Sequence, residues 1–408
     1  MTRVVVVGSG GREHALADVL GRTADTVIVT PGNAGIPGSV DTPATELDAD
    51  LFVIGPEVPL VDGLADELRA QGKLVFGPGA DGAQLEGSKA WMKDLLVAAG
   101  VPTARYGSFT DVESALAFLA TMEDLFVIKT DGLAAGKGVL VTEDRTEAEA
   151  AVREYLSGGA FGDAGSTVVI EEGLTGPEVS VFAICDGTRA IALAPAQDHK
   201  RAYDGDEGPN TGGMGAYTPV PVAGAELVAQ VMTDAIEPTL AELRQRGIDY
   251  RGALFAGLML TPSGPKMLEY NVRFGDPETQ VVLPRIESDL VELLSQAAAG
   301  NITSTPEFSD DALVTIVCAS EGYPVSPRTG DVIHGLDAAR STEGVSVYAA
   351  GVKENRAGEL ITGGGRVLNV VGRGATIEEA KANAYAGVNK ITWPGMHYRT
   401  DIGKGSTT

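Results

Sequence analysis

Short apolar runs separated by glycine and proline dominate the first 83 residues of the chain. These runs begin at Val4, Val27, Leu51 and Leu74, and a helix-like or loop segment follows each of them. Alternation of apolar strands with such segments is typical of a parallel sheet whose crossovers cover its faces. The sequence therefore predicts a Rossmann-like parallel α/β domain over residues 1–83.

The remaining residues divide into mixed α+β units. We expect residues 84–300 to form a second domain, within which residues from about 105 to 190 make a small lid subdomain of strands, a glycine loop and a helix. The stretch that starts at Asn301 has turn formers and no periodicity, which is typical of a linker. A last α+β domain is then expected within residues 301–408, so the predicted fold class is a multidomain mixture of α/β and α+β architecture.

The charge balance restricts the partners of the chain. Its 408 residues include 31 Lys and Arg against 56 Asp and Glu, which gives a formal net charge of −25. Such a charge repels the backbone of a nucleic acid, so no nucleic-acid partner is expected. An anionic small molecule would have to be held by locally placed cations and backbone N–H groups.

Cysteine usage and hydropathy indicate a cytoplasmic protein without a membrane partner. Cys185 and Cys318 are far apart and have no His or Cys at metal-ligand spacing, which disfavours a disulfide framework and a zinc site. The run Val4–Val7 is too short for a signal peptide, and no apolar stretch approaches the ~20 residues that cross a bilayer.

The stretch EYNVRFGDPE carries a candidate metal and phosphate site. On a strand, Glu269, Asn271 and Arg273 would project from the same face because side chains alternate. Mg²⁺ prefers oxygen ligands, commonly one or two carboxylates with substrate phosphates, and Arg offers a fork of donors to phosphate oxygens. The alternative is an edge strand whose polar face is only solvated.

The N-terminal segment VVVVGSGGREHAL places Gly8, Gly10 and Gly11 between an expected strand and helix. Glycines allow close approach of a ligand, and a helix N-terminus favours an anion. Glu13 occupies the third glycine position of a dinucleotide fingerprint, which disfavours NAD. The segment predicts either a loop for phosphate or another small anion, or a plain strand-to-helix turn.

A second glycine loop, DGLAAGKG, lies between the expected strands FVIKT and VLVT. It contains Gly136, Lys137 and Gly138 but has the wrong spacing and the wrong following residue for a Walker A motif. A hairpin of this kind can still fold over a triphosphate, with a surface hairpin as the alternative. Lys129 strengthens the first interpretation, because an ammonium in an apolar run is costly to bury without an anionic partner.

Two further segments have polar side chains suited to a ligand. TVVIEEGLTGPEVS ends a strand in an acidic turn with Glu171, Glu172 and Glu178, which suits an adenosine or a solvated loop. The segment 197–217 places His199, Lys200 and Arg201 beside a glycine-rich loop that suits a polar anion better than a core. A solvated loop is the alternative there too.

The ordered motifs of the whole chain closely resemble the phosphoribosylamine–glycine ligases (glycinamide ribonucleotide synthetases), an ATP-grasp family of purine biosynthesis. The resemblance runs from Val4 to about Gly403 and is carried by GGREHAL, PGNAG, GPE, PLV, QLEGSK, DGLAAGKGV, QDHKR, PNTGGMGAY, EYNVRFGDPETQ and RTGDVIHG. It implies an ATP-grasp fold for the middle domain. It also implies ATP-dependent joining of glycine to 5-phosphoribosylamine through a glycyl phosphate, with Mg²⁺ or Mn²⁺.

The resemblance also implies roles for particular residues. Glu269 and Asn271 would hold the metal, and Arg273 and Lys137 would act with Glu269 in catalysis. ATP would contact Lys89, Lys129, Gly136, Lys137, Gly138, Glu171, Glu172, Leu174 and Glu178. Glycine and phosphoribosylamine would be surrounded by Gly10, Gly11, Arg12, Glu13, Asp198, Lys200, Arg201, Asn210, Gly213, Met214 and Gly215. A monomer is expected.

Two features depart from the family pattern. Only about twenty residues separate PGNAG from GPE, so one strand or helix of the N-terminal domain is expected to be trimmed. The run ALFAGLML has no acidic residue that could serve as a further metal ligand. The alternatives to the ligase are another ATP-grasp carboxylate–amine ligase and a non-catalytic nucleotide-binding regulatory protein.

Overall fold

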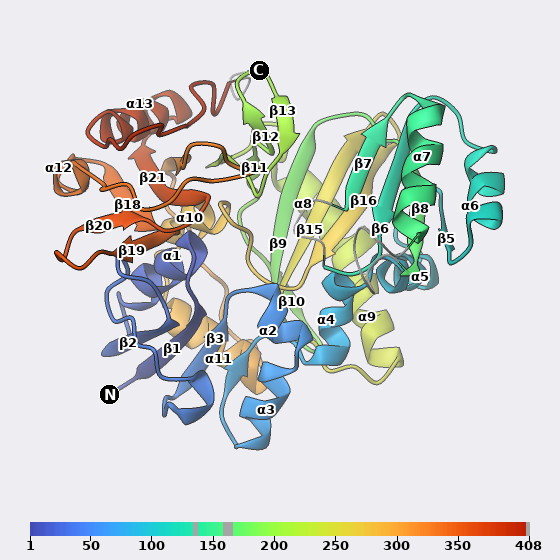
Figure 1. The fold of residues 1–408 in the computed structure, drawn as a ribbon. Coiled ribbons are helices and arrows are strands. Elements are labelled where there is room, and N and C mark those ends of the chain that lie inside the picture. Colours follow the sequence, from blue (N-terminus) through green and yellow to red (C-terminus); the bar gives the residue numbers. More distant parts are fainter. Residues whose placement is uncertain (134–137, 158–165, 405–408) are drawn as a thin grey trace.

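The computed structural model describes residues 1–133, 138–157 and 166–404, and Figure 1 shows their arrangement. Gly136 and Lys137 of the second glycine loop lie outside the described residues. Within these ranges, no helix is long and apolar enough to cross a membrane.

The N-terminal residues form the predicted parallel α/β layer. Its sheet has the order β2-β1-β3-β4, and the buried valines of β1 align with β2 on one side and β3 on the other. The strands are β1 (Arg3–Gly8), β2 (Thr26–Pro31), β3 (Leu51–Ile54) and β4 (Val75–Phe76), and the helices are α1 (Gly11–Leu20), α2 (Glu57–Val61), α3 (Leu64–Ala70) and α4 (Ala80–Gly87). Between β2 and β3, residues 32–50 contain a 3₁₀ turn, Ala44–Glu46, and no α-helix.

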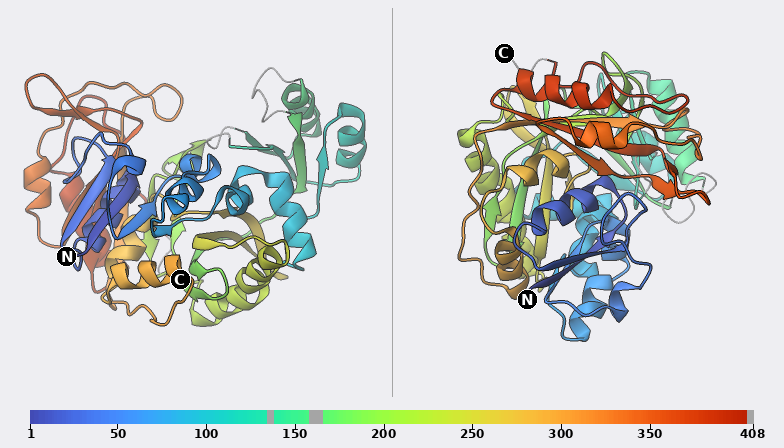
Figure 2. Two further views of the ribbon diagram at one scale, coloured as in Figure 1. Left: turned by 90° about the horizontal axis from the view of Figure 1, so that it is seen from below. Right: turned by 90° about the vertical axis from the view of Figure 1, so that its left-hand side faces the viewer.

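A second sheet with the order β5-β8-β6-β7, here called the lid sheet, stands apart from the N- and C-terminal parts (Figures 1 and 2). It is built from β5 (Tyr106–Phe109), β6 (Phe126–Thr130), β7 (Val139–Thr142) and β8 (Val168–Glu172), with α6 (Val112–Leu119) and α7 (Arg145–Leu156). Its apolar side chains form their own cluster, which includes Ala115, Ile128, Val152 and Ile170. The lid sheet therefore has a hydrophobic core separate from that of the main body.

The central sheet has the order β10-β9-β15-β16 and is antiparallel. Its strands are β9 (Glu178–Asp186), β10 (Ala190–Ala192), β15 (Arg251–Thr261) and β16 (Gly264–Asn271). The same part of the chain also forms the helices α5 (Lys89–Ala98), α8 (Ala225–Val231), α9 (Glu237–Gln245), α10 (Thr279–Val282) and α11 (Leu290–Ala299), with a π-helical turn at Met232–Ile236 and a 3₁₀ turn at Leu283–Arg285. β9 belongs to this sheet, so the lid sheet ends at Glu172.

The C-terminal sheet has the order β11-β14-β17-β21-β18. It combines β17 (Ala312–Ala319), β18 (Val345–Ala349) and β21 (Arg366–Gly374) with two earlier strands, β11 (Gln197–Asp198) and β14 (Gly215–Thr218), and is covered by α12 (Leu336–Arg340) and α13 (Ile377–Val388). Two hairpins form separate two-stranded sheets, β12 (Arg201–Tyr203) with β13 (Glu207–Asn210), and β19 (Val352–Glu354) with β20 (Leu360–Thr362). The C-terminal sheet crosses the expected boundary at residue 300, and the division into three domains stays a prediction.

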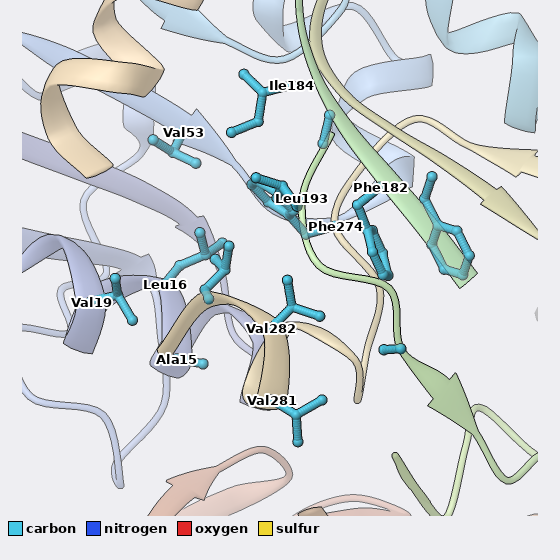
Figure 3. Close-up of a cluster of buried hydrophobic side chains, with 14 of the residues drawn as sticks. Ala15, Leu16, Val19, Val53, Phe182, Ile184, Leu193, Phe274, Val281 and Val282 are labelled. Carbon is cyan, nitrogen blue, oxygen red and sulfur yellow. The ribbon is translucent and has the colours of Figure 1, made fainter. Parts of the chain in front are cut away.

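One hydrophobic core joins the N-terminal layer to the central sheet, as Figure 3 shows. Ala15, Leu16 and Val19 of α1 lie near Val281 and Val282 of α10, and Ile184 of β9 belongs to the same cluster. Because α1 begins at the first glycine loop and α10 follows the EYNVRFGDPE segment, this packing brings the two motifs together.

The separate core of the lid sheet predicts local rather than global instability when it is weakened. Ile170 in β8 and Ile184 in β9 are both fully buried, each in a strand with neighbours on both sides. Replacing either by Ala should cost ~2–5 kcal/mol, because buried contacts are lost and a cavity remains. In hydrogen exchange, Ile170→Ala should increase exchange of the amides of strands β5 to β8 while the central sheet stays protected, and Ile184→Ala should increase exchange in the central sheet. Equal increases in both sheets in both variants would contradict the separation.

Candidate functional site

Glu269 and Asn271 lie on the same face of β16. Glu269 is exposed and Asn271 is half-buried, while Tyr270 between them points into the core at 2% exposure. Among the described residues, no hydrogen bond or ion pair engages the side chain of Glu269 or of Asn271. A carboxylate and an amide oxygen therefore stand free on one strand face, which is what a hard cation requires.

Three lysines, Lys89, Lys93 and Lys200, interact electrostatically with the Glu269 carboxylate. Burial lowers the pKa of Lys89 and brings that of Lys93 to about 8, and the charge of Glu269 opposes the lowering in both cases. Burial would also lower the pKa of Lys200, but Asp198, Glu178 and Glu269 together hold it above its usual range. In the described part of the chain, no group of three or more His, Cys, Asp or Glu side chains could hold a metal by itself. A cation here would need further ligands from a bound phosphate.

Arg273 does not share the strand with Glu269 and Asn271, which corrects the sequence expectation. β16 ends at Asn271, because the next residue, Val272, donates its backbone N–H to Glu86 Oε2 at 2.9 Å. The Arg273 guanidinium lies 2.8 Å from Glu86 Oε1 and 3.2 Å from Glu57 Oε2. These carboxylates outweigh burial and hold the pKa of Arg273 above its usual range.

Lys129 has the anionic partner that its burial requires. It is 8% exposed on β6, and its Nζ lies 2.7 Å from Glu171 Oε1 on the neighbouring strand β8. The second oxygen, Glu171 Oε2, accepts a hydrogen bond from Lys93 Nζ at 2.6 Å. Burial would raise the pKa of Glu171, but Lys129 and Lys93 lower it, so this carboxylate is charged and holds two ammonium groups.

Lys89 lies at the start of α5, beside the second glycine loop. Its Nζ donates to the Gly132 carbonyl at 2.8 Å, and the Asp131 carboxylate accepts hydrogen bonds from Ser88 Oγ and the Ala90 N–H. Gly138 is buried after the undescribed part of the loop, and its carbonyl accepts from the Thr130 N–H at 2.8 Å. The start of α5 and the strand ends of the loop are thus fixed to each other.

The acidic turn after β8 is flanked by two glutamates, Glu172 and Glu178, whose side chains have different partners. Glu172 Oε1 accepts from the Arg105 N–H at 3.0 Å and lies 3.5 Å from Lys266 Nζ, while Leu174 is half-buried. The Glu178 carboxylate forms an ion pair with Lys200, whose Nζ is also 3.6 Å from Asp198 Oδ1. Glu178, Asp198 and Lys200 therefore form one charged cluster, in which Lys200 also interacts electrostatically with Glu269.

A buried glutamate that sequence reasoning missed adjoins this cluster. Glu278 is 4% exposed, and Ser180 Oγ donates to its Oε1 at 3.3 Å. Burial, with the charge of Asp198 acting in the same direction, raises the pKa of Glu278 to about 7, while Lys200 and Arg273 lower it. This carboxyl can therefore change protonation near neutral pH.

In the first glycine loop, the side chain of Glu13 binds other residues of the same loop. Glu13 is 1% exposed; its Oε2 accepts from the Gly10 N–H at 2.6 Å and its Oε1 lies 2.5 Å from Arg12 Nε. Arg12 Nη1 also donates to the Phe274 carbonyl at 3.2 Å. A Cβ added at Gly11 would lie only 2.1 Å from Asn369 Nδ2, so glycine is required where α1 meets β21.

The segment 197–217 is divided between surface and core. Arg201 and Asn210 are exposed and line a cavity of about 580 Å³ whose wall includes Val139 of β7. Gly213 packs against Pro277, and a Cβ at Gly213 would lie 2.5 Å from the proline ring. Met214 is fully buried and Gly215 pairs with β17, so the Met214 side chain packs inside the protein.

Arg366 joins two of these segments and was not singled out in the sequence. Its Nη1 donates to the carbonyls of Gly212 and Asp276, each at 2.6 Å, and its Nη2 lies 3.4 Å from Asp276 Oδ2. Lys93 was missed as well, although a signal existed: like Lys129, it interrupts an apolar stripe, here formed by Met92, Leu95 and Leu96 on α5.

Comparison with known proteins places this geometry in a family. Models of the N, ATP-grasp (A) and C domains of phosphoribosylglycinamide synthetase match residues 2–86, 87–279 and 313–405. The chain is 49% identical to the phosphoribosylamine–glycine ligase of Caulobacter vibrioides, with 98% of this chain and 97% of the relative covered. It is 48% identical to that of an Escherichia coli O6:H1 strain, with 98% of each covered.

Solved structures agree. The crystal structure of phosphoribosylamine–glycine ligase from Thermotoga maritima matches with a TM-score of 0.87 at 34% identity, covering 98% of this chain and 100% of that one. The biotin carboxylase domain of 2-oxoglutarate carboxylase from Hydrogenobacter thermophilus, solved with ADP and magnesium, shares the fold at a TM-score of 0.74 and 17% identity, covering 97% and 91%. The chain has the ATP-grasp fold and belongs to the phosphoribosylamine–glycine ligase family.

Proposed function

We propose that this protein joins glycine to 5-phosphoribosylamine, giving glycinamide ribonucleotide, ADP and phosphate. A glycine carboxylate oxygen attacks the γ-phosphorus of ATP and ADP leaves. The amine nitrogen then attacks the carbonyl carbon of the glycyl phosphate, phosphate leaves with the electrons of the C–O bond, and the nitrogen loses a proton. The observation that carries the proposal is the Glu269–Asn271 pair, whose side chains have no hydrogen-bond or ion-pair partner among the described residues and whose carboxylate interacts electrostatically with Lys89, in a chain of this family.

Glu269 and Asn271 are the residues that would hold Mg²⁺ or Mn²⁺. The metal would neutralise charge on the ATP phosphates. Support comes from two oxygen ligands on one strand face that have no hydrogen-bond or ion-pair partner in the described part of the chain, and from cationic neighbours that suit a polyanion. Glu269 is the single carboxylate of this pair, which fits a cation that takes its remaining ligands from phosphates and water.

We assign the triphosphate to Lys89, Lys129 and the second glycine loop with Gly136, Lys137 and Gly138. The ammonium of Lys129 is anchored by Glu171 and that of Lys89 by the Gly132 carbonyl, so each is placed before ATP arrives. Adenine would lie against the backbone from Glu171 to Leu174, since the Glu171 carboxylate is already paired. Glu178 would meet the ribose while Lys200 steadies it.

Glycine and phosphoribosylamine would lie between the first glycine loop and the segment 197–217. We assign this space to Gly10 to Glu13, Asp198, Lys200, Arg201, Asn210 and Gly213 to Gly215, and the fully buried Met214 would contribute its backbone only. Arg273 would steady the transferred phosphoryl group, held in place by Glu57 and Glu86. Electrostatic stabilisation by fixed groups is the main contribution that a protein makes to phosphoryl transfer.

The same proposal includes a monomer in the cytoplasm, with the three-domain division at residues 83 and 300 and without nucleic-acid or membrane partners. The net charge of −25 supports the first of these exclusions.

The function is tested by measuring ADP release with each substrate omitted in turn. We expect release to require glycine and phosphoribosylamine together. Robust release with another acid and amine would favour a different carboxylate–amine ligase, and nucleotide binding without release under any pair would favour a regulatory protein.

Glu269→Gln should depress turnover far more than folding. The change removes the negative charge offered to the metal but no core packing, so kcat should fall by at least about 100-fold with little change in the melting temperature. Glu226→Gln is a matched control, because Glu226 is also an exposed glutamate, lies on α8 and has no role in the proposed site. Near-full activity of Glu269→Gln, or its unfolding, would contradict the assignment.

Glu278→Gln should change how stability depends on pH. Because the pKa of Glu278 is raised to about 7 in the folded protein, the folded state holds a proton that the unfolded state releases at lower pH. This carboxyl therefore makes the protein lose stability as pH rises from about 4.5 to about 7. Denaturant unfolding at several pH values should show that the free energy of unfolding falls less across this interval in the variant than in the unchanged protein. Identical decreases would show that the pKa of this carboxyl is not raised.

A further inference from the structure

Lys93 is a charged residue in the apolar stripe of α5 and is fully buried. Its Nζ donates to Glu171 Oε2 at 2.6 Å and to Thr103 Oγ1 at 2.8 Å. None of the roles assigned above requires this ammonium. Burying a lysine is costly, and replacing a buried ion pair by apolar residues is often neutral or stabilising, so packing alone does not explain it.

Thr103 connects Lys93 to β16, the strand that bears the candidate metal site. Its hydroxyl donates to the Met267 carbonyl at 2.7 Å, and the Met267 N–H donates to the Pro102 carbonyl at 2.8 Å. The segment Pro102–Thr103 is therefore hydrogen-bonded to β16 two residues before Glu269.

At its other end the same chain of contacts reaches Lys129. Glu171 Oε1 lies 2.7 Å from Lys129 Nζ, while Glu171 Oε2 accepts from Lys93. A continuous polar connection, here called the relay, thus runs from Lys129 through Glu171, Lys93 and Thr103 to Met267. It links the lid sheet, which has its own hydrophobic core, to the strand that bears Glu269 and Asn271.

We propose that Lys93 and Thr103 are positioning residues that fix Lys129 relative to Glu269 and Asn271, and so align the nucleotide phosphates with the metal. The inference rests on the proposed ATP and metal sites. Lys93 acts through Glu171, because it supplies the second counter-charge and holds the carboxylate in one orientation. Thr103 accepts a hydrogen bond from Lys93 and donates one to the Met267 carbonyl. Because hydrogen bonds depend on angle, these two bonds fix the orientation of Lys93 relative to β16.

The test uses Thr103→Val, which removes the hydroxyl at nearly constant shape, and Thr103→Ser, which keeps it. Binding of a non-hydrolysable ATP analogue is measured by direct titration with and without Mg²⁺. Thr103→Val should weaken binding about three- to tenfold in the presence of Mg²⁺ and reduce the gain in affinity that Mg²⁺ gives, while Thr103→Ser stays close to the unchanged protein. The KM for glycine should not change.

A double-mutant cycle with Lys93→Met separates the relay from a general loss of stability. In the Lys93→Met protein, Thr103→Val should change affinity by less than about twofold, because the two residues act along one path. Additive effects, or equal affinities of Thr103→Val and Thr103→Ser, would overturn the proposal even if melting temperatures fall. If Lys93→Met does not fold, the valine–serine comparison decides alone. Because these titrations measure binding and need no turnover, they can be interpreted even if the ligase assay shows no activity.

Discussion

Pairing of Lys129, Lys93 and Arg273 with carboxylates is the interaction on which the candidate site depends. Glu171 holds Lys93 and Lys129, and Glu57 and Glu86 hold Arg273. In a protein of net charge −25, such pairs place positive charge where an anionic substrate needs it and fix it before the substrate binds. Removing one partner of a buried pair costs ~3–5 kcal/mol, because an uncompensated charge remains. Replacing a whole buried pair by apolar residues is often neutral or stabilising, so the pairs contribute placement more than stability.

Much of the fold follows from patterns that act over short distances. The apolar runs at Val4, Val27 and Leu51 became strands because residues of this kind bury well in a parallel sheet. Lys129 could be identified for a similar reason, since an ammonium in a buried strand requires an anion nearby. The sequence could not say which anion, and Glu171, some 40 residues away, was assigned to adenine instead of to the lysine.

Contacts between distant segments account for what the sequence did not reveal. Arg273 leaves the strand face because Glu86 accepts the Val272 N–H, and these partners are 186 residues apart. Glu57 reaches the same arginine over 216 residues. Met214 looked like part of a polar loop, yet it is buried where that loop enters a sheet made with C-terminal strands. Local periodicity in the sequence does not predict contacts between residues so far apart.

Two kinds of contact join the parts of this protein, and they do different work. The N-terminal layer and the central sheet share an apolar core, which is strong but non-directional. The lid sheet has its own core, and the relay through Lys93 and Thr103 joins it to β16 by hydrogen bonds that tolerate little change in distance or angle. Apolar packing alone would leave the distance between Lys129 and Glu269 loosely defined. A reaction that aligns phosphates with a metal depends on such alignment, because small displacements sharply reduce its rate.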